Sequence, residues 1–175
     1  MPMLDAYIPQ GALTAEAEER LLAELTDLLI THEGADPSNA LVRSIAWVFL
    51  HRPAAVYVGG ERLAEPRYRF IASVPEGQFD SERRQALVES VTEAVLDAEN
   101  GAYERDPMRV WVFTPEIPEG TWGGAGRVIT LADIATFATG DAGAAGTAAA
   151  TSPWTLWQLV QLTPALPWSE RRKFG

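Results

Sequence analysis

Two stretches of the chain place apolar residues at the same helical spacing. Leucines follow an i, i+1, i+4, i+8 pattern in the first stretch, and leucine and valine repeat it 66 positions later. The two sets are Leu21, Leu22, Leu25 and Leu29, and Leu87, Val88, Val91 and Val95. This spacing is typical of one apolar stripe on an amphipathic helix. Thr14 and Asp80, also 66 apart, are suitable N-cap residues. The pattern therefore predicts two equivalent helices within a repeat.

Each predicted helix is followed by a β-rich run with Trp-Val-Phe at its centre. These runs extend over Arg43–Gly60 and Met108–Gly124, and each continues through a proline and an aromatic residue to a glycine pair. Each copy therefore predicts the order strand, helix, strand. A helix that connects two strands of one sheet makes them parallel with a right-handed crossover. We expect an α/β fold of tandem βαβ units, with a four-stranded sheet and two helices on one face.

This arrangement leaves the second face of the sheet without a cover. The strand segments AWVFL and RVWVF are apolar at nearly every position, which favours burial on both faces. Oligomerisation would cover the bare face, and so would the C-terminal segment of the same chain. The predicted organisation is a tandem βαβ domain over 1–137, with repeats at 2–64 and 66–137. A small-residue linker follows at 138–153, and then a Trp-rich arm at 154–175 that either reaches a neighbouring subunit or packs locally.

Composition narrows the classes of function. The 175 residues are 47% hydrophobic and carry a formal net charge of −10, with a pI of about 4.6. A hydrophobic core is therefore expected, whereas nucleic-acid and anionic-membrane partners are not, because both need clustered Lys and Arg. The absence of cysteine excludes disulfides and thiolate chemistry and favours a cytoplasmic setting. Two histidines make no His-rich metal site, and neither a signal peptide nor a membrane span is expected.

The residue with the most distinctive chemistry is Pro2, directly behind the initiator methionine. Proline at a strand start costs little, because the position needs no N–H donor. However, methionine before a small residue is normally removed, which would leave a secondary amine at the terminus. Such an amine can accept a proton, donate one, or attack a carbonyl. Pro2 is therefore a candidate catalytic residue.

Pro2 combined with the duplicated βαβ unit and the glycine pairs resembles the tautomerase superfamily, whose founding type is 4-oxalocrotonate tautomerase. The double-length arrangement is similar to the branch that contains cis-3-chloroacrylic acid dehalogenase. The matching pieces are Pro2, Leu13-Thr14, Thr26-Asp27 and the run Trp111–Pro118, and the resemblance spans roughly residues 2–135. It implies a cofactor-independent enzyme that acts through its amino-terminal proline, assembled as a homo-oligomer, above all a trimer. Tyr68, the counterpart of Pro2, is internal, so one prolyl site is expected per chain.

The resemblance also implies that an arginine holds the carboxylate of a small-molecule substrate. Arg109 matches the family pattern best, because it opens the RVWVF strand. Arg67 and Arg69 are two apart on the third predicted strand and so share a face, where two guanidinium groups would favour a carboxylate. Trp122 stands where the family carries a pocket aromatic, and Phe113 stands where the dehalogenase branch has a tyrosine. For each of these residues a purely structural role stays open.

Other positions depart from the dehalogenase pattern. Its helix histidine is Leu29 here, its two arginines are Pro75 and Gln78, and its water-activating glutamate is Gly124. These losses argue against hydrolytic dehalogenation. We expect a tautomerase or isomerase that uses Pro2 as general base or acid on a small keto or unsaturated carboxylic acid. The alternatives are a hydratase, decarboxylase or dehalogenase-like lyase on the same fold, and a non-catalytic oligomeric protein.

Overall fold

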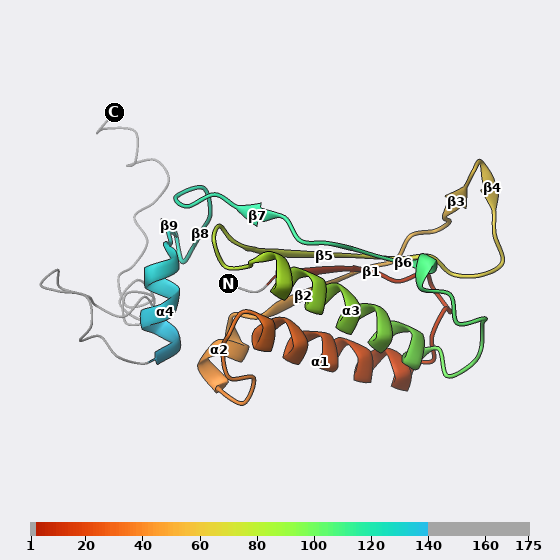
Figure 1. Cartoon of the computed structure of the whole chain (residues 1–175), viewed down its shortest axis with the longest axis horizontal. Helices are drawn as coiled ribbons and strands as arrows, with labels where there is room; N and C mark the ends of the chain where they lie inside the picture. The colour runs from red at the N-terminus through yellow and green to blue at the C-terminus, as the bar shows by residue number, and fades with distance from the viewer. Residues whose placement is uncertain (1–2, 140–175) are drawn as a thin grey trace, which may run out of the picture.

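A computed structural model describes residues 3–139 of the chain (Figure 1). The first half contains β1 (Met3–Tyr7), α1 (Ala15–His32), α2 (Ala40–Ser44), β2 (Trp47–His51), β3 (Tyr57–Val58) and β4 (Glu61–Arg62). The second half contains β5 (Tyr68–Pro75), α3 (Ser81–Ala98), β6 (Val110–Phe113), β7 (Glu116–Ile117), β8 (Gly123–Gly124), β9 (Arg127–Val128) and α4 (Leu131–Thr139). A 3-10 turn, Pro107–Arg109, precedes β6. The two halves therefore have nearly the same order of elements.

The main sheet has the strand order β2-β1-β5-β6. Strand β1 is parallel to β2 and β5 is parallel to β6, whereas β1 and β5 are antiparallel where the two repeats meet. The short strand β7 pairs with the last residues of β5. Helices α1 and α3 lie side by side on one face of the sheet (Figure 1). The predicted fold class, tandem βαβ units with two helices on one face, is confirmed.

Equivalent hydrogen bonds show how closely the two repeats agree. The side chains of Thr14 and Asp80 cap α1 and α3, and each accepts from the backbone N–H three residues later. Within the helices, the hydroxyls of Thr26 and Thr92 each donate to the carbonyl four residues earlier, at 2.8 and 2.7 Å. The predicted caps and the predicted 66-residue relation between the helices are thus present in the structure.

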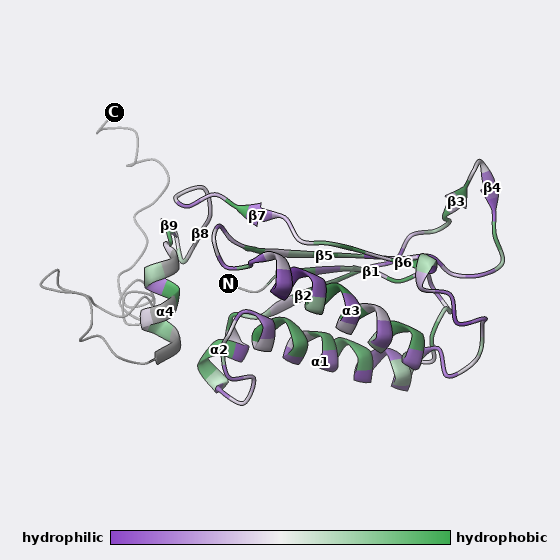
Figure 2. Ribbon diagram, viewed as in Figure 1, coloured by the Kyte–Doolittle hydropathy of each residue, from purple (hydrophilic) through white to green (hydrophobic). Residues whose placement is uncertain are grey.

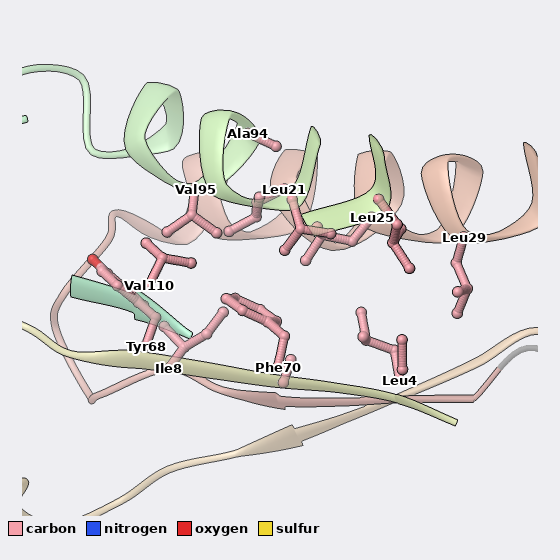
Figure 3. Packing of buried hydrophobic residues seen from close by; sticks show 14 of the residues in the cluster. Leu4, Ile8, Leu21, Leu25, Leu29, Tyr68, Phe70, Ala94, Val95 and Val110 are labelled. Atoms are coloured by element: carbon pink, nitrogen blue, oxygen red, sulfur yellow. The ribbon is translucent and has the colours of Figure 1, made fainter. Parts of the chain in front are cut away.

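The core lies between the helices and the sheet. The apolar stripes of both helices point toward the strands, and polar residues lie on the outer side of α1 (Figure 2). Figure 3 shows the contact between the two layers, in which Phe70 and Leu4 rise from the sheet toward Leu21, Leu25 and Leu29. Phe70 is fully buried. Burial of large apolar side chains contributes roughly 1.5–3 kcal/mol each, so this layer contact stabilises the fold.

The opposite face of the sheet is open in the protomer and carries two matching aromatic pairs. Trp47 and Phe49 on β2 are 55% and 43% exposed, and Trp111 and Phe113 on β6 are 58% and 41% exposed. Each tryptophan Nε1 donates to the carbonyl three residues earlier, at 3.2 Å in both repeats. The bare face that the apolar strand pattern predicts is therefore present, at both edges of the sheet.

The C-terminal part of the domain adds a hairpin and a helix. Strands β8 and β9 form the hairpin, whose turn contains Ala125 and Gly126, both at positive φ. Helix α4 extends to Thr139, two residues into the stretch expected as a linker. The rest of that stretch and the Trp-rich arm lie outside the described residues. Between residues 3 and 139, no helix is long and apolar enough to cross a membrane.

Candidate functional site

Pro2 lies outside the described residues, so its surroundings are defined by its neighbour in the sequence. Met3 opens β1 and pairs with Trp47 on β2 and with Ser73 on β5. Because β1 and β5 are antiparallel, the start of β1 lies beside the end of β5. Strand β7 extends the same end of the sheet through pairing at Val74. This end of the sheet is where the sequence places the candidate amine.

Polar groups gather at this end between the sheet and the helices. Glu33 is the C-cap of α1, and the Gln78 side chain, from the β5–α3 turn, donates to its backbone carbonyl. One carboxylate oxygen of Glu33 is buried. Burial raises the pKa of the Glu33 carboxyl to about 7, and the positive charge of the chain's amino terminus acts in the opposite direction. A carboxyl of this kind can exchange a proton near neutral pH.

An arginine also lies near this end. Arg84 on α3 forms an ion pair with Glu116 on β7 and donates to the Phe79 carbonyl at 3.2 Å. This ion pair joins α3 to the strand that extends β5. Neither Glu33 nor Arg84 stood out in the sequence. The one signal for Glu33 was its distance from Glu99, because the two glutamates are 66 positions apart.

Four of the predicted substrate-binding residues gather at the other end of the sheet. Arg67, Arg69, Arg109 and Phe113 line one cavity of about 670 Å³. Strand β5 begins at Tyr68, so Arg67 lies just before the strand on which it was expected. Arg69 pairs with Tyr7, the last residue of β1. Four residue steps, or about 13 Å, separate the two ends of β1, so this cavity is remote from the start of β1 in the same protomer.

Arg109 is committed to a structural ion pair. Its side chain is fully buried, and its two terminal nitrogens donate to the two carboxylate oxygens of Glu99. One of these nitrogens also donates to the Glu104 carbonyl at 2.6 Å. The hydrogen bonds to Glu99 raise the pKa of Arg109. A substrate carboxylate could reach this guanidinium only by displacing Glu99.

Arg69 is the more accessible cation of this cavity. Its guanidinium lies 5.3 Å from the ring centre of Tyr7 and 5.2 Å from that of Phe113, which are cation–π contacts. Within the described residues Arg69 has no carboxylate partner, whereas Arg67 is 3.5 Å from Glu65 and donates to the Pro66 carbonyl. Of the three predicted arginines, Arg69 could therefore bind an anion without giving up an ion pair to a carboxylate of the described residues.

Trp122 belongs neither to the residues at the start of β1 nor to the cavity that contains Arg69. It is half-buried beside the β8–β9 hairpin and lines a shallow cavity of about 500 Å³ with Thr121 and Arg127. Its backbone carbonyl accepts from Ile129 at 3.2 Å. Figure 1 places this hairpin and the start of β1 toward the same end of the long axis of the molecule.

Comparison with known proteins explains the duplicated architecture. Residues 72–132 match the family model described as tautomerase enzyme. This segment of the chain therefore carries a tautomerase domain. The matched segment runs from the end of β5 through β9 and into α4, so it corresponds to most of the second repeat. No curated protein sequence matches the chain.

Solved structures of tautomerase-superfamily proteins share the fold over about three quarters of this chain. F6 fused 4-OT, solved as an asymmetric trimer, is 21% identical with a TM-score of 0.59, over 72% of this chain and 94% of that one. N1, of the cis-3-chloroacrylic acid dehalogenase family, is 20% identical with a TM-score of 0.59, over 73% and 82%. Pt0534, solved after inactivation by 2-oxo-3-pentynoate, is 22% identical with a TM-score of 0.59, over 75% and 98%. These likenesses show that the chain shares the fold of the fused structures that its sequence resembles.

The described part of the chain contains no cluster of side chains arranged to hold a metal ion. Between Met3 and Thr139, no group of three His, Asp or Glu side chains is arranged to hold an ion. The structure thus separates the predicted residues into three places. The start of β1 carries Glu33 and Gln78, the far cavity carries the three arginines and Phe113, and the hairpin carries Trp122.

Proposed function

We propose that this tautomerase-superfamily member is a cofactor-independent isomerase of a small keto or unsaturated carboxylic acid. Its acid–base group is the nitrogen of Pro2, which becomes a secondary amine when Met1 is removed. The observation that carries this proposal is the position of β1. The strand that follows Pro2 begins at one end of the sheet, next to the buried carboxyl of Glu33 and the amide of Gln78.

The chemistry follows from the properties of a prolyl amine. An α-amino group has a reference pKa near 8, and apolar surroundings lower it while a neighbouring carboxylate raises it. Such an amine can move a proton between the carbon and the oxygen of an enol or enolate. The inactivation of Pt0534 by a 2-oxo acid with a reactive triple bond supports the choice of substrate class for this chain.

We propose Arg69 of a neighbouring protomer as the anchor of the substrate carboxylate. In one protomer Arg69 and the start of β1 lie at opposite ends of a strand, so a single chain does not bring them together. Its accessible guanidinium and the adjacent Phe113 ring suit a carboxylate on an apolar stem. Arg69→Ala should raise KM about tenfold or more, through loss of a charge-assisted hydrogen bond. Arg62→Ala, on an exposed strand, is the matched control and should leave KM unchanged.

This arrangement requires an oligomer, and we propose a trimer. The exposed Trp47, Phe49, Trp111 and Phe113 supply apolar area on the open face of the sheet. The fused 4-OT relative that shares the fold is a trimer. Native mass spectrometry should give three chains per particle, and Trp47→Glu combined with Trp111→Glu should give monomers.

One observation favours a second candidate, a non-catalytic oligomeric protein. Arg109, the arginine that best matches the family's carboxylate anchor, is locked in a buried ion pair with Glu99. A lyase of the hydratase, decarboxylase or dehalogenase type has weaker support. A water-activating carboxylate near the second β-hairpin would have to be Glu116 or Glu119, and Glu116 is already paired with Arg84.

Ketonisation of phenylenolpyruvate tests the proposal. The natural protein should accelerate the reaction, and Pro2→Ala should lower kcat/KM about 100-fold or more, the usual contribution of a general acid or base. Pro2→Ala and Pro2→Gly both leave a primary amine once Met1 is removed, so the two variants should lose activity to a similar extent if the secondary amine is the reactive group. Equal rates for the natural protein and Pro2→Ala would favour the non-catalytic candidate.

A further inference from the structure

The open face of the sheet carries a row of four side chains, one from each main strand. In the order of the sheet, the row consists of His51 on β2, Tyr7 on β1, Arg69 on β5 and Phe113 on β6. Tyr7 pairs with both His51 and Arg69, so these three residues lie side by side across the sheet. Phe113 pairs with Ile71, two residues after Arg69, and side chains two apart on a strand point to the same face. The four side chains therefore project from one face, near the end of β1.

Arg69 is the centre of this row. Its neighbours on β5, Tyr68 and Phe70, are buried on the helix side of the sheet, so alternation directs Arg69 to the open side, where it is exposed. The guanidinium carbon lies 5.3 Å from the ring centre of Tyr7 and 5.2 Å from that of Phe113. Because β5 runs between β1 and β6, the two rings flank the guanidinium from opposite sides. Arg69 is thus held between two cation–π contacts.

Tyr7 is itself held in place from its other side. The imidazole of His51 stacks on the Tyr7 ring, with ring centres 4.3 Å apart and an angle of 10° between the planes. His51 Nε2 donates to Asp5 Oδ1 at 2.6 Å, and Asp5 lies two residues before Tyr7 on the same face of β1. The Tyr7 ring therefore lies between an imidazole that is fixed by a hydrogen bond and the guanidinium of Arg69.

The ring contacts leave Arg69 able to bind an anion. Arg67 and Arg109, the other two arginines of the cavity, are paired with Glu65 and Glu99. Among the described residues no carboxylate pairs with Arg69, and neither ring contact replaces a charge-assisted hydrogen bond to an anion. A long side chain normally loses much rotational freedom when it binds a ligand. A guanidinium that two rings already hold loses less of this freedom.

The row borders the cavity of about 670 Å³ that Arg69 lines. Much of the remaining wall is apolar or aromatic, and includes Val56, Tyr57 and Trp111. A carboxylate also lines the cavity, that of Asp106, and it accepts a hydrogen bond from the backbone N–H of Met108 at 2.9 Å. An acid bound at Arg69 would therefore have apolar surface beside its stem.

From this row we infer that Tyr7 is a positioning residue, whose ring, supported by His51, keeps the Arg69 guanidinium in place for the carboxylate of the substrate. Phe113 supports the guanidinium from the other side. The inference rests on the proposed function, which identifies the anion at Arg69 as the substrate carboxylate. Tyr7 then acts on substrate binding through Arg69, so its contribution should vanish when Arg69 is absent.

The test is a double-variant cycle, read out by ketonisation of phenylenolpyruvate. Tyr7→Leu should raise KM about three- to tenfold, because the Arg69 side chain must then be ordered when the substrate binds. The same change should leave kcat within about twofold, because Tyr7 takes no part in proton transfer. Tyr7→Phe keeps the ring and should keep the KM of the natural protein. In an Arg69→Ala background, Tyr7→Leu should have no further effect on KM.

The matched control is Tyr57→Leu, which removes an exposed ring of the same cavity that is not stacked on Arg69 in the described structure. Its effect on KM, whatever its size, should be equal with and without Arg69. Circular dichroism and native mass spectrometry check the fold and assembly of each variant. Should Tyr7→Leu fail to fold, His51→Leu removes the support of the Tyr7 ring instead. It should raise KM about twofold, again only where Arg69 is present.

Binding of 3-phenylpropanoate, measured by isothermal titration calorimetry, separates this inference from the proposed function, because it needs no turnover. Tyr7→Leu should weaken this binding by the same factor as it raises KM. An effect of Tyr7→Leu that is as large without Arg69 as with it, an unchanged affinity, or no binding by the natural protein would overturn the inference. Loss of turnover in Pro2→Ala would still support the function in each of these cases. Coupling of Tyr7 to Arg69 in binding, without any turnover, would instead support the role of Tyr7 and overturn the proposed function.

Discussion

The C-terminal ends of α1 and α3 are built alike but are used differently. At the end of α3, Glu99 is closed off by Arg109 and Tyr68 within the core. At the end of α1, the counterpart Glu33 has no such arginine, because the residue that matches Arg109 in the first repeat is Ile45. The difference teaches that the same architectural position carries a fully buried ion pair in one repeat and, in its copy, a carboxyl whose pKa burial raises to about 7.

Hydrogen bonds explain why the buried ion pair at the end of α3 is stable. Removing two charges from water is costly, and a buried ion pair recovers that cost only with good geometry and additional hydrogen bonds. The two parallel bonds from Arg109 to Glu99, with the Tyr68 hydroxyl and the Glu104 carbonyl, provide them. Removing only Arg109 or only Glu99 would leave the other charge buried without its partner. We therefore expect the loss of one charge to lower the free energy of unfolding far more than the loss of both.

The largest expected effect on stability comes from breaking the ion pair between Arg109 and Glu99 at the end of α3. Arg109→Met should lower the free energy of unfolding by about 3–5 kcal/mol, because it leaves the Glu99 carboxylate buried without its counter-charge. Urea denaturation measures this loss, and Arg62→Met on an exposed strand is the control. The double variant Glu99→Gln/Arg109→Met should lose less than Arg109→Met alone. A rise in KM with unchanged stability would instead assign Arg109 to substrate binding.

A smaller loss of stability is expected when the Tyr68 hydroxyl is removed. Tyr68→Phe should lower the free energy of unfolding by about 1.5 kcal/mol, through loss of a hydrogen bond to a charged group. Tyr57→Phe, at a tyrosine that is 63% exposed, should have no measurable effect in the same urea denaturation. Equal stability of Tyr68→Phe and the natural protein would mean that the Tyr68–Glu99 bond contributes nothing, and the comparison between the repeats would lose its basis.

The smallest effect concerns a feature that the repeats share. Thr14→Ala and Asp80→Ala should each cost about 1 kcal/mol, because each removes the side chain that accepts a hydrogen bond at a helix N-terminus. Similar losses in thermal unfolding would confirm that the helices start in the same way. A large difference between the two variants would indicate that the repeats already diverge at their helix N-termini.

The sequence predicted the parts of the fold that depend on local pattern. Apolar stripes, caps and the repeat interval defined α1 and α3, and the Trp-Val-Phe runs defined β2 and β6. Helices α2 and α4 and the short strands were not predicted, because each is too short or too dependent on tertiary contacts for periodicity to reveal it. Strand β7, for example, exists through pairing with the end of β5.

The candidate site was predictable only in part, for two physical reasons. Alternation along a strand assigned Arg69 to a face, but it could not say which end of β1 that residue would meet. Arg109 matched a family position, yet whether a guanidinium is available depends on its partner. That partner, Glu99, lies across a loop that carries no sequence signal for pairing. Conversely, the repeat could have pointed to Glu33 from the sequence. Glu33 and Glu99 are 66 positions apart, and so are Pro2 and Tyr68.

The central claim is that the reactive group is the amine of Pro2, at the start of the first repeat. Its most direct test is mass mapping after treatment with 2-oxo-3-pentynoate. The chain suits this measurement, because it has no cysteine and Lys173 is its only lysine. The account predicts one adduct per chain, on the N-terminal peptide that begins with Pro2, together with loss of activity. Modification at Lys173 or a histidine while the prolyl amine stays unlabelled, or retention of Met1 in active protein, would contradict it.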